Sequence, residues 1–397
     1  MHLGFYYHVP VVPSAEGLKI PAYLGVFVDS LASEVEKLTI FMHEANDYDT
    51  MRCDYILKSK NLQFITLGLK TPAWDRFLFP WRTLFKIRNA AAECDVLLIR
   101  GPSPLAPSFY NFFHNQTIVV FLLVGDYIDG AKNLNLPSLR VFAIKLLIYR
   151  NEFQLRRKIR HTMTLVNSAE LLMKYRKITS NIHKIKTTTL VKADFYYRKD
   201  TCIENHIKLL YTGVLTLNKG LMELIEATSL LIKDGYNVSV HFVGGEYDSK
   251  SKVKDQLVDK AHKLNLVNSV FFYGYLKKGE ELNSMYRTSD IYILPSYYEG
   301  FPRTIWEALA NCLPVIATSV GSIPYSLVDH KDALLIPPRD SKSIYLAIQE
   351  VITNSALRST LIENGLKLAR ESTLEIQNKK IVAHIEDYLS QGSRAHR

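Results

Sequence analysis

Two glutamates flank a short turn in the second half of the chain and could bind the hydroxyl groups of a sugar. Glu299 precedes Gly300 and Pro302, and Glu307 lies eight residues after Glu299. Glycine permits a tight turn, and proline suits the first position of a helix because its missing N–H costs nothing there. The amides and dipole of such a helix start form an anion site suited to a diphosphate. The pattern indicates carboxylates beside a phosphate-binding turn.

The elements that must position these groups follow an α/β pattern. The hydrophobic fraction of 47% and the charged fraction of 22% are those of a globular protein and exclude wholesale disorder. Short apolar runs alternate with amphipathic stretches, which favours two doubly wound parallel sheets in series. The expected strands are residues 3–9, 38–42, 64–67, 96–100, 118–123, 163–167, 208–211, 238–243, 270–273, 291–294, 315–317 and 333–336. The glutamate turn follows the strand at 291–294, at the end where open α/β sheets bind ligands.

Several motifs in the second half occur in an order typical of one enzyme family. They are Tyr211-Thr-Gly213, Lys219-Gly220, Phe242-Val-Gly244-Gly245, Phe271-Phe-Tyr-Gly274, Asp290-Ile-Tyr-Ile-Leu-Pro-Ser296, Glu299-Gly-Phe-Pro302, Glu307-Ala-Leu-Ala310 and the segment from Pro314 to Pro324. Together they resemble the retaining family 4 (group 1) glycosyltransferases of the GT-B fold. The resemblance covers residues 208–340. It implies an α/β protein with two Rossmann-like parallel-sheet domains that face a cleft.

The resemblance also implies a domain organisation. We expect an N-terminal acceptor-binding domain over residues 1–200 and a C-terminal domain for a nucleotide-sugar donor over residues 201–373. A C-terminal helix and tail over residues 374–397 complete the chain, and this helix can pack back on the N-terminal domain. The boundary falls in a polar segment at residues 195–205, before the strand at 208–211.

The family's functional roles fall on identifiable positions of this sequence. Lys219 would neutralise the diphosphate as it leaves, and Gly213 would let the backbone approach the phosphates. Glu307 would hold the ribose hydroxyls, and Glu299 the hydroxyls of the transferred sugar. The turn that would bind the same diphosphate comprises Phe301, Pro302, Arg303 and Thr304.

The sequence departs from the family pattern at four places, one of which is the run Ser322-Ile-Pro-Tyr325, where the family has glycine, isoleucine, proline and glutamate. Val214 occupies the place of a second cation, so Arg303 or another basic residue would have to substitute for it. Cys312 stands where glycine is common. Gly125 stands where many relatives have a histidine near the reacting sugar.

In the first half, three residues are candidates for the site. Arg100 ends a strand in Arg-Gly-Pro and could place charge near the cleft. Gly17 matches a glycine-rich turn after the first strand, although an ordinary surface turn would look the same. Asp126 follows the strand at 118–123, where it could accept a hydrogen bond from donor or acceptor, act as a base, or simply cap a loop.

No metal or other cofactor is expected. Asp47 and Asp49 fit the D-x-D signature by which glycosyltransferases of another fold hold a divalent ion, but they lack the context of that fold. The four cysteines lie far apart and form no C-x-x-C pair, which argues against zinc and fits a reducing cytosol.

The net charge of +10 is concentrated in one region. Residues 131–192 carry 14 Lys and Arg against Glu152 and Glu170, a local excess of +12. Within it, residues 136–159 predict a basic amphipathic helix with an apolar face of Val141, Ile144, Leu147, Ile148, Leu155 and Ile159. Such a helix suits an anionic membrane surface, and an ordinary helix with a basic solvent face fits equally well. Nucleic acid is not expected, because no RNA-binding motif accompanies the charge.

These observations lead to one expected function and two alternatives. We expect a metal-independent, retaining glycosyltransferase that moves a sugar, with a UDP-sugar as the favoured donor, to a glycan or lipid-linked glycan in surface polysaccharide synthesis. The N-terminus shows no signal peptide and the longest apolar stretch is too short to span a membrane. The expected location is therefore the cytoplasm, including the inner face of the membrane. The alternatives are a GT-B nucleotide-sugar epimerase and a non-catalytic basic protein that binds membrane or nucleic acid.

Overall fold

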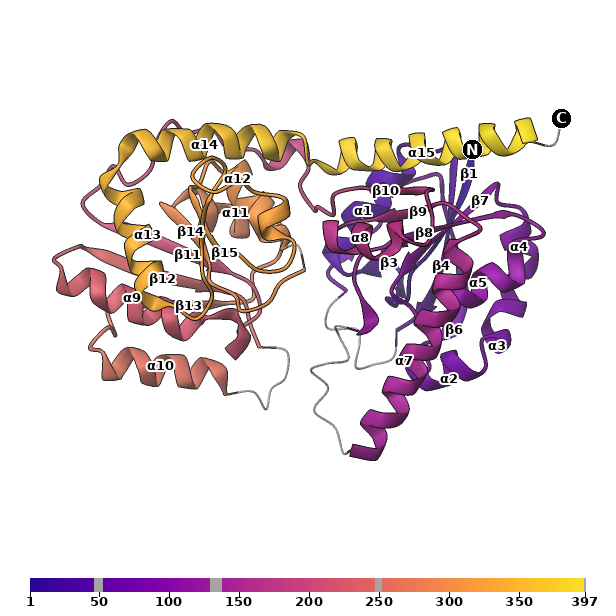
Figure 1. The fold of residues 1–397 in the computed structure, drawn as a ribbon, viewed down its shortest axis with the longest axis horizontal. Helices are drawn as coiled ribbons and strands as arrows, with labels where there is room; N and C mark the ends of the chain where they lie inside the picture. The colour runs from indigo at the N-terminus through magenta and orange to yellow at the C-terminus, as the bar shows by residue number, and fades with distance from the viewer. Residues whose placement is uncertain (46–52, 129–137, 247–251, 301, 396–397) are drawn as a thin grey trace. The chain divides into compact units, whose positions relative to one another are not determined.

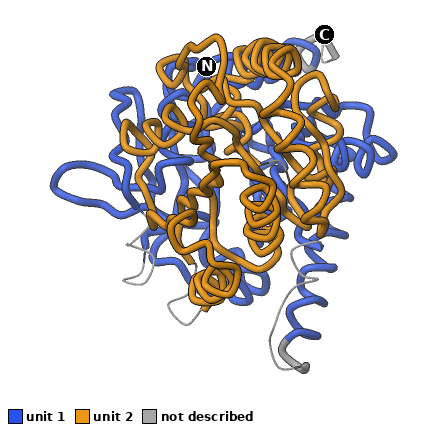
Figure 2. Tube along the Cα trace, turned by 90° about the vertical axis from the view of Figure 1, so that its left-hand side faces the viewer, with its two compact units in different colours: residues 1–187, 374–397 blue, residues 188–373 orange. Residues whose placement is uncertain are grey.

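The computed structural model describes residues 1–45, 53–128, 138–246, 252–300 and 302–395 of the chain (Figure 1). The chain divides into two compact units, drawn in different colours in Figure 2. Unit 1 comprises residues 1–187 and 374–397, and unit 2 comprises residues 188–373. The boundary between the units follows residue 187, before the expected boundary at residue 200, because Leu190 already belongs to the core of unit 2.

Unit 1 is built on a parallel sheet with the strand order β10-β9-β8-β7-β1-β4-β6. The strands are β1 (His2–Tyr6), β4 (Lys37–Glu44), β6 (Leu62–Leu69), β7 (Val96–Gly101), β8 (Ile118–Leu123), β9 (Thr164–Val166) and β10 (Ile182–Lys184). The central strands β1, β7 and β8 are almost entirely buried, which explains why they read as short apolar runs in the sequence.

A small antiparallel sheet accompanies the parallel sheet of unit 1. Its strands are β2 (Val12–Ser14), β3 (Gly17–Ile20) and β5 (Tyr55–Ile56), in the order β2-β3-β5. The sequence did not predict it, because strands of two to four residues carry too few positions for a periodic signal.

Helices cover the sheet of unit 1. They are α1 (Ala22–Ala32), α2 (Ala73–Leu78), α3 (Trp81–Leu84), the 3₁₀ turn η2 (Phe85–Ile87), α4 (Arg88–Ala92), α5 (Ala106–Phe113), α7 (Ser138–Ile159) and α8 (Ala169–Arg176). Helix α1 ends at Ala32, and residues 37–44 form β4. Within the described parts of the chain, no helix has the length and apolar character needed to cross a bilayer.

Unit 2 repeats the architecture with a parallel sheet of order β13-β12-β11-β14-β15-β16. The strands are β11 (Ile207–Thr212), β12 (Val238–Val243), β13 (Val270–Gly274), β14 (Ile291–Leu294), β15 (Val315–Thr318) and β16 (Leu334–Ile336). The helices are η3 (Lys192–Asp194), η4 (Leu217–Lys219), α9 (Leu221–Lys233), α10 (Val253–Lys263), α11 (Glu280–Arg287), α12 (Arg303–Ala310), η5 (Ile323–Tyr325), α13 (Ser341–Thr353) and α14 (Ser355–Arg370). All the predicted strands of this half are present.

The last helix, α15 (Leu374–Ala395), belongs to unit 1, where it packs along α1 (Figure 1). The side chain of Asn378 donates a hydrogen bond of 3.2 Å to the carbonyl of Phe27 in α1. The amide of Lys186 donates a 2.8 Å hydrogen bond to the side chain of Gln377. These contacts involve buried polar groups, so the helix is an integral part of unit 1.

Candidate functional site

The candidate residues of unit 2 gather at one edge of its sheet. Gly213 follows β11, Lys219 ends η4 in the connection after β11, and Glu299 lies in the connection from β14 to α12. Strands β11 and β14 are parallel neighbours, so their carboxyl ends meet at the same edge. This is the edge at which open α/β sheets bind their ligands.

Two glycines allow the loops at this edge to touch. Gly220 has a φ of +65°, and a Cβ on it would lie 2.0 Å from the carbonyl oxygen of Pro295. Gly244 has a φ of +136°, and its Cβ would lie 1.8 Å from the carbonyl oxygen of Gly213. Both conformations and both approaches exclude other residue types. The first contact holds the connection that carries Lys219 against the end of β14.

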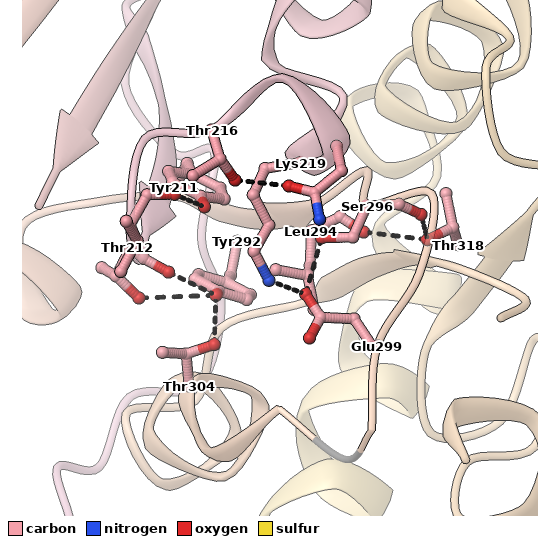
Figure 3. Close-up of polar contacts among 12 residues, drawn as sticks. Tyr211, Thr212, Thr216, Lys219, Tyr292, Leu294, Ser296, Glu299, Thr304 and Thr318 are labelled. Carbon is pink, nitrogen blue, oxygen red and sulfur yellow. Dashed lines mark hydrogen bonds and ion pairs between the residues drawn. The ribbon is translucent and has the colours of Figure 1, made fainter. Parts of the chain in front are cut away.

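Lys219 and Glu299 form an ion pair at this edge, as Figure 3 shows. The hydroxyl of Ser296 donates a hydrogen bond of 2.7 Å to the same carboxylate oxygen, Oε1 of Glu299. Ser296 is in turn fixed by Thr318, whose hydroxyl donates to the Ser296 carbonyl at 2.5 Å. Glu299 is only 9% exposed, so its contacts with Lys219 and Ser296, rather than contacts with water, position the carboxylate.

Glu307 lies in α12 and has different partners from Glu299. Its Oε2 accepts a hydrogen bond of 2.8 Å from the hydroxyl of Tyr286, and its Oε1 accepts one of 2.9 Å from Thr189. Burial, together with the negative charge of Glu307, raises the pKa of Tyr286 well above its usual value. Tyr286 therefore stays a neutral donor that orients the carboxylate.

The first turn of α12 is tied to the sheet by a second buried tyrosine (Figure 3). The hydroxyl of Tyr292 in β14 donates a hydrogen bond of 2.6 Å to the side chain of Thr304. Pro302 is the N-cap residue, one position before the place expected for it, and gives no side-chain oxygen to cap the turn. Arg303 is the first residue of the helix. The turn has the arrangement in which helix starts bind anions.

The remaining candidates lie elsewhere in the structure or outside its described part. In unit 1, Oδ2 of Asp126 forms an ion pair of 2.6 Å with Lys174, which also pairs with Glu152 at 2.7 Å. Gly17 opens β3 in the hairpin with β2. Phe301 lies outside the described residues, as do Asp47 and Asp49.

One departure from the family pattern is explained by the backbone. Cys312 has a φ of +53°, in the left-handed region that favours glycine. The turn that usually contains glycine is thus kept here with a side chain. That side chain is buried and packs with Ile362 and Leu366 of α14, which explains how the position accommodates it.

Sequence reasoning missed the side chains that orient the two glutamates. Ser296, Thr189 and Tyr286 contact the carboxylates, yet none of them was singled out from the sequence. Ser296 lies within a recognised motif, and its position three residues before Glu299 was the available signal. Thr189 is 118 residues from Glu307 along the chain, so no local pattern could have indicated it.

Comparison with known proteins finds a family that matches unit 2. The family model described as "Glycosyl transferases group 1" matches residues 196–368. This part of unit 2 resembles a group 1 glycosyltransferase domain. Protein CapJ of Staphylococcus aureus is 29% identical over 54% of this chain and 55% of its own length. The capsular polysaccharide biosynthesis glycosyltransferase CapM of the same organism is 26% identical over 49% of this chain and 54% of its own length. The chain spans about half the length of these curated relatives.

Structural similarity extends beyond the group 1 domain. Anabaena HepE, solved in complex with UDP, superposes with a TM-score of 0.71 over 98% of this chain and 100% of its own, at 16% identity. This likeness confirms the expected fold class, the GT-B fold with two Rossmann-like domains.

Proposed function

We propose that the chain is a retaining glycosyltransferase that moves a sugar from a UDP-sugar to a glycan or lipid-linked glycan during surface polysaccharide synthesis. The observation that carries the proposal is the ion pair of Lys219 with the nearly buried Glu299, beside the start of α12, in a segment that matches the group 1 family. The presence of UDP in HepE and the capsular role in the name of CapM also support it.

The proposed chemistry is mainly the stabilisation of charge on the leaving diphosphate. An ammonium group has three N–H donors, so Lys219 can bind Glu299 and still donate to phosphate oxygens. The uncapped turn at Pro302, Arg303 and Thr304 adds backbone amides and the positive end of the helix dipole. Glu299 would accept hydrogen bonds from the transferred sugar, and Glu307, oriented by Tyr286, from the ribose.

The proposed reaction retains the configuration of the sugar. The bond from the anomeric carbon to the diphosphate oxygen breaks while the acceptor hydroxyl oxygen bonds to the same face of that carbon. The hydroxyl proton passes to the leaving diphosphate, so no metal is required. Direct roles for Asp126 and Gly17 remain predictions, and so does metal independence.

A thermal-shift panel of nucleotide sugars tests the donor class. We expect UDP-sugars to stabilise the full chain, by about 2.7 kcal/mol at a concentration of 100 times the dissociation constant. GDP-sugars and free sugars serve as controls. A flat response to every UDP- and GDP-sugar would contradict the proposed donor, and conversion of the donor to an epimer without acceptor would favour the epimerase.

We also propose that the enzyme works on an anionic membrane surface, at the inner face of the cytoplasmic membrane, and that α7 contacts it. Ile148, Leu155 and Ile159 of the predicted apolar face are buried within unit 1. A second apolar stripe, spaced i, i+4, i+7 and i+11, lies outward and is 55–70% exposed: Phe142, Leu146, Tyr149 and Phe153. Residues at this spacing share one helix face. Lys145, Arg150 and Arg157 flank the stripe, as in helices that lie in a lipid interface.

Vesicle flotation tests this membrane contact. We expect Phe142→Ser combined with Phe153→Ser to weaken binding to phosphatidylglycerol-containing vesicles at least about tenfold, because two large apolar groups no longer enter the interface. Leu346→Ser, at an exposed leucine of α13 in unit 2, is the matched control and should change nothing. Binding that is equal for all three proteins, or equal for neutral vesicles, would exclude α7 as the membrane contact.

A further inference from the structure

Unit 1 gathers basic side chains at the carboxyl edge of its own sheet. Strands β7, β1, β4 and β6 are consecutive neighbours in that sheet. Arg100 is the last residue but one of β7, and His8 follows β1. His43 is the last residue but one of β4, and Arg76 lies in α2, the first helix after β6. We call these four residues the basic cluster. None of them belongs to the site of unit 2.

The basic cluster is buried, and several of its nitrogens have no hydrogen-bond partner. Arg76 and Arg100 are each 5% exposed, and His43 is 1% exposed. Among the described residues, the Nε and Nη1 atoms of Arg76 and Nδ1 of His8 are buried and have no hydrogen-bond partner. Buried polar groups in proteins are almost always paired, and unpaired guanidinium donors are especially costly. The donors of Arg76 therefore point to an acceptor that binds beside them.

The charges around the basic cluster have the sign that an anion requires. Burial, with the positive charges of Arg76, Lys70 and Arg100, lowers the pKa of His8 to about 3. Burial and the charge of Arg76 likewise lower the pKa of His43 to about 4. The guanidinium of Arg100 lies 4.7 Å from the ring centroid of Tyr7 and 5.0 Å from that of Phe27, which fixes its plane. The positive charges of Arg76, Lys70 and Arg100 therefore all act at His8, where they would attract a negative group.

We propose that the basic cluster of unit 1 binds a phosphate group of the acceptor. This inference rests on the proposed function, since it names the chemical class of the acceptor for that reaction. A phosphate carries a charge near −2 and three terminal oxygens, which match two arginine side chains and the imidazole of His8 better than the two oxygens of a carboxylate do. Arginine in particular binds phosphate through two parallel N–H···O bonds. The phosphate can belong to a sugar phosphate or to a lipid carrier.

Phosphate binding by the full chain tests the proposal. UDP is present throughout at saturating concentration to occupy the donor site, and inorganic phosphate, glucose 6-phosphate and glucuronate are titrated in turn. We expect both phosphates to raise the Tm and glucuronate to do so only at concentrations at least tenfold higher. Arg76→Met should weaken phosphate binding at least tenfold, because it removes a charge-assisted bidentate contact. Arg82→Met, at an exposed arginine of α3, should bind phosphate like the wild type.

A structural role for Arg76 would give a different result. Without phosphate, Arg76→Met should unfold at or above the wild-type temperature, because it removes a buried charge whose Nε and Nη1 have no partner among the described residues. If Arg76→Met unfolds at a lower temperature with or without phosphate, or if phosphate binding is unchanged in it, the proposal is wrong. Arg76→Lys keeps the positive charge but loses the paired N–H donors of the guanidinium, so it should fold and bind phosphate several-fold more weakly. This variant still tests the proposal if Arg76→Met does not fold.

Two further experiments identify the source of the phosphate and distinguish this proposal from the proposed function. Vesicles with a polyprenyl phosphate that bind the wild type more tightly than Arg76→Met would identify the lipid carrier as the source, and competition by glucose 6-phosphate alone would identify a sugar phosphate. Lys219→Ala should lose UDP-sugar binding and keep phosphate binding, measured without UDP. If no UDP-sugar binds although phosphate binding depends on Arg76, the proposed function fails and the anion site stands.

Discussion

Lys219→Ala is expected to lower kcat at least about a hundredfold with the native donor and acceptor. The ammonium group would stabilise charge that develops on the leaving diphosphate, and the loss of one such preorganised group typically costs two to three orders of magnitude. Steady-state release of UDP measures the effect. Lys233→Ala, at an exposed lysine at the end of α9 in the same unit, is the control and should keep full turnover.

The ion pair with Glu299 requires a second variant for a clear interpretation. Lys219→Ala leaves a nearly buried carboxylate whose remaining hydrogen bond within the described site comes from Ser296, so part of any loss could come from a displaced loop. Glu299→Gln added to Lys219→Ala removes that charge and should restore the Tm without restoring turnover. Recovery of activity in the double variant, or full activity of Lys219→Ala, would remove Lys219 from the mechanism.

Gly244→Ala is expected to destabilise unit 2 by roughly 3 kcal/mol and to lower its Tm by roughly 6–12 °C. The new Cβ would lie 1.8 Å from the carbonyl oxygen of Gly213, in a backbone conformation with a φ of +136°. One of the two loops must therefore move, and UDP-sugar binding should weaken with it, because Gly213 belongs to the proposed donor site. Thermal unfolding and the thermal-shift panel measure both effects.

The neighbouring glycine is a matched control. A Cβ on Gly245 would meet nothing within 4 Å, and its φ lies outside the left-handed region. Gly245→Ala should therefore unfold within about 1 °C of the wild type and bind UDP-sugars normally. Equal destabilisation by the two substitutions would show that the close approach of Gly244 to Gly213 is not what holds these loops.

The parallel sheets could be predicted from the sequence because their strands are buried on both faces. Strands β8 and β14 are continuous apolar runs, and their predicted limits agree with the structure. The hairpin of β2 and β3 could not be predicted, since short exposed strands leave no such run. The boundary between the units was placed too late because Leu190 enters the core of unit 2 from a polar stretch of sequence.

The candidate site was predictable only where local motifs contain it. The motif around Glu299 and Glu307 indicated the turn and the helix, and the topology of adjacent parallel strands brings Lys219 to the same edge. The orienting contacts from Thr189 and Tyr286 depend on long-range packing. The same holds for α7, whose outward aromatic residues could be distinguished from its inward ones only when the position of the helix on unit 1 was known.

The return of α15 to unit 1 affects the order in which the protein is made. Unit 2 is a continuous segment, whereas unit 1 is interrupted by it and is completed by residues 374–395. Domains commonly fold in order as they leave the ribosome, from the N-terminus onward. Here the first domain to begin synthesis is the last that can be finished, because Asn378 and Gln377 reach their partners in unit 1 only after all of unit 2 has been translated. Until then the face of α1 that α15 covers has no α15 to pack against.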